Sequence, residues 1–515
     1  MRIKETIRLD IGRLRGPAFW ISLILVSGIP RVLAALLLPN PDGDEYSYVN
    51  NIEMWRASMS AGTFSIKSLF GFWFPMYQFV CAVICLLVDH PAYVSKLVSA
   101  VSGTGVCLFV YSISMRLVER RTYAILAFLF IALNPIHILF SAFTMTDVPH
   151  AFCVLGSLYF VLERRWKLAA LFVAAGSMMR IESWMLVALV PMLQIVVERR
   201  VSFRALTILI IGPLFWLYIC WDATGNPFQY FETRKNYVDS VLAAYPYLAL
   251  SVERIRTDTD LLLYSANLVL LIGGLAGVCL TVGQLTRLRI RRVPESLFGI
   301  VAVGAYFASF LVFIAAAYLT RNQPEIFDRY GLILLVLEIP IVAWTFAQIG
   351  ERKPYFARIL MVLVMVMTFA DIEKRLADLP LYVSFGRPEQ IIANNIKSKF
   401  EANGDILFFC DDATVQELSG IPKERFIDSS GSPSDRESFL KHLKDKGVQF
   451  LVCADTEESI PVRLFPELRS GVGDELFELF APQTRKDWHG RVWLYRFLSW
   501  NLPASEGSRG GDFGE

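Results

Sequence analysis

Charged residues are scarce in this sequence, and the two signs almost cancel. They make up 19% of the 515 residues, with 50 Lys and Arg against 48 Asp and Glu, which gives a net charge of +2 at pH 7. Lys and Arg occur in short clusters between apolar runs and form no single basic face. Proteins that bind nucleic acids usually carry such a face, so we expect no nucleic-acid partner.

Cysteine is almost missing outside the apolar runs. Six of the eight cysteines lie within such runs, where Cys usually acts as a small buried hydrophobic residue. The other two, Cys410 and Cys453, each end a short strand-like run in the C-terminal region. If that region faces an oxidising compartment, the two thiols have the opportunity to form a disulfide.

Apolar and aromatic side chains, by contrast, are abundant. Hydrophobic residues make up 54% of the chain, with 38 Phe and 11 Trp, far more than in an ordinary soluble protein. The first apolar run, Phe19–Leu38, is about long enough to cross a bilayer. Five basic residues in Met1–Arg15 favour a cytoplasmic N-terminus. We therefore expect a multi-pass integral membrane protein, typical of a prokaryotic cell membrane, with this first helix kept as an anchor.

Basic clusters define the expected topology. They lie at Arg116–Arg121, Arg164–Lys167, Arg199–Arg204, Arg287–Arg292 and Arg352–Arg358. If all of them face the cytoplasm, each interval between them holds an even number of crossings. Tyr123–Phe140 is then one outward helix, while Trp73–Val88 is too short to span and is interpreted as interfacial or re-entrant. With a last outward helix near Ile359–Phe369, we expect about 11 transmembrane helices and an extracytoplasmic C-terminus.

The C-terminal region has a different pattern, because helix-like and strand-like stretches alternate from about residue 387. We expect a transmembrane module at 1–371, a linker at 372–386, a small soluble α/β domain at 387–500 and a disordered tail at 501–515. The soluble region has no Gly-rich phosphate loop and no metal-ligand spacing. Its expected role is accessory or acceptor-binding.

On this topology, acidic and basic motifs gather at the outer face. The acids are Asp44, Glu45, Asp147 and Glu182, and the arginines are Arg31, Arg180, Arg321 and Arg329, with Tyr330 beside the last. Ionisable groups this close to lipid are functional candidates, and a guanidinium binds phosphate oxygens with two parallel hydrogen bonds. Solvated loop acids and arginines that reach lipid headgroups are the structural alternatives. His137 and His150 flank the second outer loop and are interpreted as capping or packing residues.

The order of these motifs resembles the GT-C glycosyltransferases, notably the branch of protein mannosyltransferases and aminoarabinose transferases. These are membrane enzymes that use polyprenyl-phosphate sugars. The matching phrases are Asp44-Glu45 followed by an aromatic residue, the second-loop acid Asp147, Arg180-Ile181-Glu182 and Arg329-Tyr330. The short helix after Phe74-Pro75 resembles the family's Pro-Pro helix, although it has only one Pro.

The resemblance implies a GT-C-like fold and an inverting transfer of a sugar, a hexose such as mannose, from a polyprenyl-phosphate carrier to an extracytoplasmic hydroxyl. Asp44 would act as the base, and Glu45 and Asp147 would orient the acceptor. Asp44 and Asp147 would optionally share Mg²⁺ or Mn²⁺. The donor would be bound by Arg31, Arg180, Glu182, Arg321, Arg329 and Tyr330, and we expect Asp44, Asp147 and Arg180 to line one outward-facing cavity. The acceptor stays open between protein, lipid and polysaccharide.

Two other functions fit a polytopic chain with intramembrane charges. An oligosaccharyltransferase-like enzyme would transfer a whole glycan, but the C-terminal region lacks the Trp-Trp-Asp phrase of that branch. A secondary transporter or flippase would show two repeated halves and charges at the midplane. No such repeat is found here, and the charged motifs lie at one face.

We predict that a reporter fused after Phe369 or at the C-terminus is extracytoplasmic, and that reporters at Arg165 and Arg289 are cytoplasmic, because basic clusters stay on the cytoplasmic side. Paired phosphatase and fluorescent-protein fusions at each position measure this, since each reporter is active on one side only. A cytoplasmic C-terminus would contradict the shared outer face of the motifs.

Overall fold

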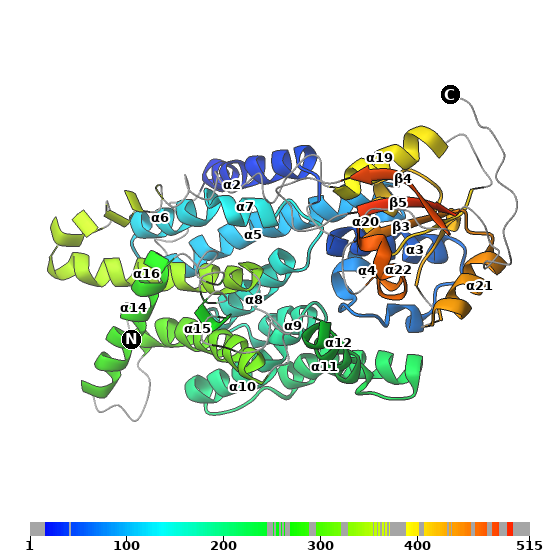
Figure 1. Cartoon of the computed structure of the whole chain (residues 1–515). Helices are drawn as coiled ribbons and strands as arrows, with labels where there is room; N and C mark the ends of the chain where they lie inside the picture. Colours follow the sequence, from blue (N-terminus) through cyan, green and yellow to red (C-terminus); the bar gives the residue numbers. More distant parts are fainter. Residues whose placement is uncertain are drawn as a thin grey trace, which may run out of the picture. The chain divides into compact units, whose positions relative to one another are not determined.

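The structure is a computed structural model of the chain (Figure 1). It describes residues 16–40, 43–244, 268–287, 295–320, 328–353, 388–400, 406–429, 435–454, 459–470, 476–483 and 492–497, together with scattered positions in 251–262, 355–370 and 432–433. The expected linker at 372–386, the expected tail at 501–515 and part of the expected last helix at 359–369 lie outside the described residues.

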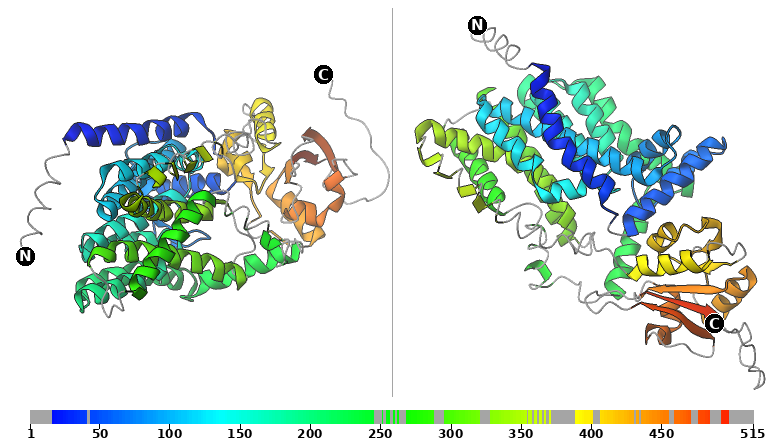
Figure 2. Two further views of the ribbon diagram at one scale, coloured as in Figure 1. Left: turned by 90° about the vertical axis from the view of Figure 1, so that its left-hand side faces the viewer. Right: turned by 90° about the horizontal axis from the view of Figure 1, so that it is seen from above.

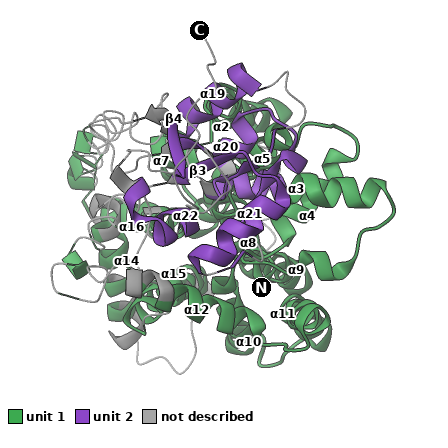
Figure 3. Ribbon diagram, turned by 45° about the vertical axis from the view of Figure 1, so that its right-hand side comes forward, with its two compact units in different colours: residues 1–40, 51–382 green, residues 41–50, 383–515 purple. Residues whose placement is uncertain are grey.

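The chain divides into two compact units (Figure 3). The first unit holds residues 1–40 and 51–382, and the second holds residues 41–50 and 383–515. The division cuts helix α3 (Gly43–Ser60). The first turns of that helix, which carry Asp44 and Glu45, therefore group with the second unit.

The first unit is helical. Its elements are α2 (Pro17–Leu37), η1 (Ile66–Leu69), α4 (Met76–Cys85), α5 (Pro91–Val118), α6 (Arg121–Ala132), α7 (Pro135–Phe140), α8 (Asp147–Leu162), α9 (Trp166–Ser177), η2 (Ile181–Ser183), α10 (Trp184–Glu198), α11 (Phe203–Thr224), α12 (Gln229–Ala244), α14 (Leu268–Arg287), α15 (Glu295–Leu319), η4 (Asp328–Tyr330) and α16 (Gly331–Arg352). Helix α5 is central and packs against α2, α6, α8 and α16, while α8 packs in turn on α9. The long helices of this unit lie side by side (Figure 2).

Six helices among the described residues are long and apolar enough to cross a membrane. They cover Pro17–Leu37, Pro91–Val118, Ile181–Glu198, Phe203–Thr224, Leu297–Leu319 and Gly331–Glu351. On α2 the large apolar side chains Ile21, Leu25 and Ile29 are 50–53% exposed, which suits contact with lipid tails and would be costly in water. The chain is an integral membrane protein.

Local signals determine where these helices begin and end. Helix α11 begins after Ser202, whose hydroxyl oxygen accepts the N–H of Ala205 and so satisfies one of the free donors of the first turn. It ends at Gly225, which has a φ of +77°. Glycine adopts this left-handed conformation without a Cβ clash.

The expected single helix over Tyr123–Phe140 is wrong, because the chain breaks between α6 and α7. Pro135 has no N–H to continue the ladder of α6. Asn134 instead caps a new helix, with its side-chain oxygen accepting the N–H of His137 at 2.9 Å. The short helix expected after Pro75 is present as α4, which is 10 residues long.

The second unit contains a five-stranded sheet. Its strands are β1 (Phe408–Phe409), β2 (Phe426–Ile427), β3 (Phe450–Ala454), β4 (Phe477–Gln483) and β5 (Val492–Phe497), and its helices are α19 (Pro388–Phe400), α20 (Ala413–Leu418), η5 (Lys423–Arg425), α21 (Arg436–Lys446), α22 (Ile460–Leu464) and η6 (Pro466–Ser470). The strand order is β2-β1-β3-β5-β4. Strands β2, β1 and β3 are parallel, and β5 runs antiparallel to β3 and β4. Helices α19 and α20 contribute to the core on one face, and α21 and α22 to the core on the other.

The two C-terminal cysteines lie on opposite faces of this sheet. Successive side chains of a strand point to alternate faces. Cys410 packs with Phe408 in one core, whereas Cys453 packs with Phe409 in the other. Both thiols are free and buried, and burial raises the pKa of each well above its usual value. The disulfide considered from the sequence is therefore not formed.

Candidate functional site

Three segments of the first unit meet around the guanidinium of Arg180. The N-terminus of α8 supplies Asp147 in its first turn, where a carboxylate is favoured by the helix dipole. The turn between α9 and α10 supplies Arg180 and Glu182. The residue before α16 supplies Tyr330. Each segment holds one of the motifs singled out in the sequence.

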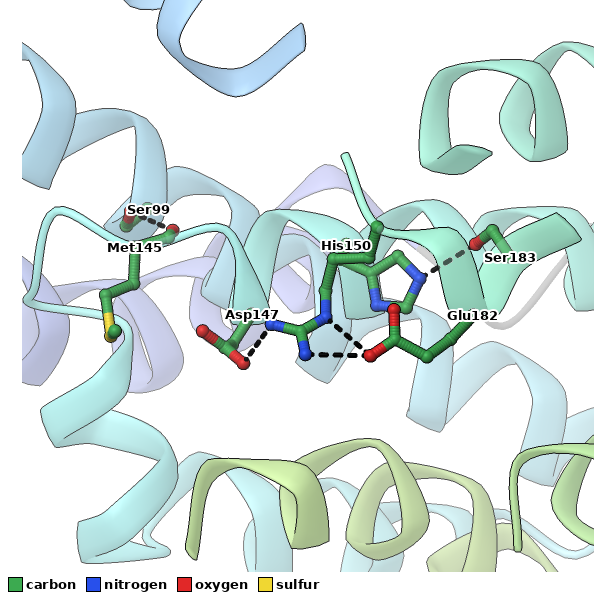
Figure 4. Close-up of polar contacts among 7 residues, drawn as sticks. Ser99, Met145, Asp147, His150, Glu182 and Ser183 are labelled. Atoms are coloured by element: carbon green, nitrogen blue, oxygen red, sulfur yellow. Dashed lines mark hydrogen bonds and ion pairs between the residues drawn. The ribbon is translucent and has the colours of Figure 1, made fainter. Parts of the chain in front are cut away.

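Arg180 bridges the two carboxylates (Figure 4). Its Nη1 donates to Asp147 Oδ1 at 2.8 Å, its Nη2 donates to Glu182 Oε1 at 2.8 Å, and its Nε donates to the same Glu182 oxygen at 3.2 Å. The side chains are 16% exposed in Arg180, 6% in Asp147 and 11% in Glu182. The three groups thus form one largely buried ion-pair cluster.

The electrostatics of this cluster favour the charged form of Arg180. Burial by itself lowers the pKa of Arg180, but the Glu182 and Asp147 carboxylates outweigh it and hold that pKa well above its usual value. With Arg180 charged and both acids ionised, two negative charges face one positive charge. The cluster then carries a net charge of −1 and attracts a cation or a hydrogen-bond donor.

Aromatic side chains border the cluster. The guanidinium of Arg180 lies 5.2 Å from the centre of the Tyr330 ring, within the range of a cation–π contact. Arg329, next to Tyr330 in η4, is partly buried. Tyr230 of α12 interacts electrostatically with both Arg180 and Tyr330, and burial raises its pKa to about 12. Its phenol is therefore neutral at pH 7.

A buried polar network precedes Asp147 in the chain. Asn40 Nδ2 donates to Thr144 Oγ1 and the Thr144 N–H donates to Asn40 Oδ1, each at 3.2 Å. The Thr144 and Ser95 hydroxyls share a hydrogen bond of 2.9 Å, and Ser99 Oγ donates to the Met145 carbonyl at 3.4 Å. These bonds tie the segment before α8 to the end of α2 and to α5. The network was not predicted from the sequence, where its one signal was the Asn40-Pro41 phrase after the first span.

Arg31 is enclosed by the helices of the first unit. It is 0% exposed, and its Nη1 and Nη2 donate to the Ala132 and Ile131 carbonyls at 3.2 and 3.0 Å. These are carbonyls of the last turn of α6, which the helix itself cannot satisfy. Nη2 also bonds His137 Nδ1 at 2.7 Å. Arg31 therefore caps α6, and its expected contact with substrate stays a prediction.

The remaining predicted residues lie elsewhere. Asp44 and Glu45 occupy the first turn of α3. Glu45 is buried and Asp44 is partly buried. Their expected approach to Asp147 stays a prediction. Arg321 lies outside the described residues.

The predicted divalent cation has limited support from the donor set. Within the part of the chain that the structure describes, no group of three or more His, Cys, Asp and Glu is placed to hold a metal ion. Asp147 Oδ1 already accepts from the Arg180 guanidinium. An ion shared by Asp44 and Asp147 is therefore not carried into the proposal.

No protein-family model matches the chain, and no curated protein sequence matches it either. Solved structures do match. The chain, with its helical unit and its small C-terminal sheet, has the fold of one of them.

One of these solved structures is ArnT from Cupriavidus metallidurans bound to undecaprenyl phosphate. It superposes with a TM-score of 0.57 at 15% identity and covers 95% of this chain and 100% of the ArnT chain. ArnT is an aminoarabinose transferase of the GT-C family. The structure of ArnT in the apo state matches with a TM-score of 0.45 at 15% identity, over 93% of this chain. Similarity at this identity establishes the fold.

We predict that Arg180→Ala lowers the free energy of unfolding by about 3–5 kcal/mol, because it leaves two buried carboxylates without their counter-ion. Arg116→Ala is the matched control. Arg116 pairs with Glu163 but is 47% exposed, so its loss costs about 0–1 kcal/mol. Unfolding of the purified protein in detergent measures both changes. Equal losses in the two variants would contradict a special role for the Arg180 cluster.

Proposed function

We propose that this protein is a membrane glycosyltransferase that transfers a sugar from a polyprenyl phosphate to an extracytoplasmic acceptor hydroxyl. The observation that carries the proposal is the meeting of Asp147, Arg180, Glu182 and Tyr330 in one buried cluster, on a fold shared over nearly the whole chain with ArnT. That ArnT structure is bound to undecaprenyl phosphate, which supports a donor of this class.

The chemistry of transfer needs few groups. A sugar on a lipid phosphate already has a good leaving group, so the enzyme has to deprotonate the acceptor hydroxyl and stabilise the departing phosphate. We propose Asp44 as the base, at the junction between the first span and the outer loop, with Glu45 beside it. Attack from the face opposite the phosphate inverts the anomeric carbon. The oxygen of the acceptor replaces the phosphate oxygen, and the phosphate leaves with the bonding electron pair.

The geometry around Arg180 refines the roles proposed for the other residues. Three of its nitrogens already donate to Asp147 and Glu182, and the donor phosphodiester, which carries one negative charge, would meet a cluster whose net charge is −1. We therefore assign Arg180 to orienting the two carboxylates, which in turn hold the acceptor hydroxyl. We propose that Arg329 binds the donor phosphate, together with Arg321 from the same loop.

The sugar and the acceptor are the finer parts of the proposal. We propose a hexose donor such as a mannosyl polyprenyl phosphate, and we expect the acceptor to be a protein, lipid or polysaccharide hydroxyl. ArnT, which shares the fold, transfers aminoarabinose. A donor panel has to include both a neutral hexose and an amino sugar.

We predict that Asp44→Asn lowers turnover by about two to four orders of magnitude and leaves donor affinity largely intact, because the amide keeps the shape and loses the basicity. Arg329→Ala should weaken donor binding as well as rate, since a phosphate contact acts in both ground and transition states. The assay measures turnover and donor affinity with one competent polyprenyl-phosphate sugar.

Two control variants accompany Asp44→Asn and Arg329→Ala. Asp222→Asn, near the end of α11, and Arg116→Ala remove the same charges outside the proposed site and should keep near-normal turnover. Full activity of Asp44→Asn would refute the assignment of the base. An Arg329→Ala variant with normal donor affinity would move the phosphate contact to another residue.

A further inference from the structure

Helix α8 is joined to the turn that carries Arg180 at two places, not one. The first link is the ion pair between Asp147 and Arg180. The second is a hydrogen bond of 2.8 Å between His150 Nε2 and Ser183 Oγ. From the first link to the second, the residue on α8 changes from Asp147 to His150 and the residue in the turn from Arg180 to Ser183, three positions along the chain in each case. Residues three apart on a helix lie on one face, so one face of α8 contacts both ends of the turn (Figure 4).

The second link is enclosed on all sides by the fold. His150 is 3% exposed and Ser183 is 0% exposed. The imidazole packs edge-on against Phe310 of α15, with ring centres 5.9 Å apart. A Cβ built on Gly176 would approach Ser183 Oγ to 2.9 Å, so only glycine at this position leaves the hydroxyl in place. The Ser183 hydroxyl is therefore held between α9 and His150.

The turn that carries Arg180 is short. Segment η2 is 3 residues long, and the Ser183 N–H reaches the Arg180 carbonyl only at 3.3 Å. Glu182 lies between the two anchor points. Its carboxylate interacts electrostatically with His150 as well as with Arg180. If the Ser183 anchor is released, the link from α8 to this turn that remains is the Asp147–Arg180 ion pair, which holds Arg180 and not Glu182 directly.

We propose that His150 is a positioning residue for the acid cluster. It holds Ser183, and through Ser183 it fixes the turn so that Arg180 can bridge Asp147 and Glu182 at once. The burial of the ring and the bond of Nε2 to Ser183 favour this role over proton transfer to a substrate. This inference rests on the proposed function, since a positioned acid cluster matters for transfer only if the cluster contacts substrate.

The test uses variants that break or keep the hydrogen bond. His150→Leu and Ser183→Ala remove it, while His150→Gln places an amide near the former Nε2 and can share a hydrogen bond with Ser183. We expect the first two to lower kcat by about 10- to 100-fold, the cost of displacing a reacting group by about 1 Å, with donor affinity within about twofold of wild type. His150→Gln should recover most of the rate. The double variant should be no slower than either single one, because both changes remove the same link.

A matched control comes from the same helix. Ser157 Oγ and Tyr306 Oη share a buried hydrogen bond, also of 2.8 Å, between α8 and α15. Ser157→Ala should affect thermal unfolding about as much as Ser183→Ala and leave kcat unchanged. If Ser157→Ala slows transfer equally, or if the rate losses of His150→Leu and Ser183→Ala multiply in the double variant, the positioning role is refuted.

Failure of this inference can be told apart from failure of the proposed function. If wild-type protein releases polyprenyl phosphate from a sugar donor but the His150 and Ser183 variants keep full kcat, the inference fails and the function stands. If wild type acts on no donor, the function fails, and the positioning role fails with it. In that case, non-additive effects of the His150 and Ser183 substitutions on thermal unfolding show only that the hydrogen bond exists.

Discussion

A charge buried among membrane helices has to be paired, because leaving it alone in a medium without water costs several kcal/mol. Arg180 satisfies this constraint by bridging Asp147 and Glu182. The bridge joins the start of α8 to the turn before α10, and Tyr330 at the start of α16 packs against the guanidinium. Three segments that lie far apart in the sequence are thereby brought to one place. Within this cluster, two carboxylates face one guanidinium.

The rest of the helical unit keeps those segments in position. The break at Asn134 and Pro135 turns the chain before α8, and Arg31 satisfies the carbonyls that the break exposes at the end of α6. The Asn40–Thr144 bonds hold the segment between α7 and α8. These contacts are buried and polar, so each one depends on its partners being present.

The long apolar run Phe19–Leu38 predicted α2 to within a few residues, because an apolar run of about 20 residues is seldom anything but a membrane-spanning helix. Tyr123–Phe140 was wrong because its apolar pattern continues through the break. The order of the motifs predicted that Asp147, Arg180, Glu182 and Tyr330 are candidates for the functional site. It did not predict that Arg180 would bridge two carboxylates. The partners of Arg31 and His150 are tertiary, and a single sequence holds no signal for which carbonyl or hydroxyl they meet. In the second unit, the strand-like run that ends at Cys453 corresponds to β3, whereas the two-residue strand β2 was not predicted.

The most direct test of the central claim is turnover of purified protein on a panel of polyprenyl-phosphate sugars, followed by mass spectrometry. The panel should contain a neutral hexose and an amino sugar, each with protein, lipid and polysaccharide acceptors. The account predicts release of polyprenyl phosphate together with an acceptor that gains one sugar of inverted anomeric configuration. Sugar transfer from none of these donors, by protein shown to be folded, would contradict it.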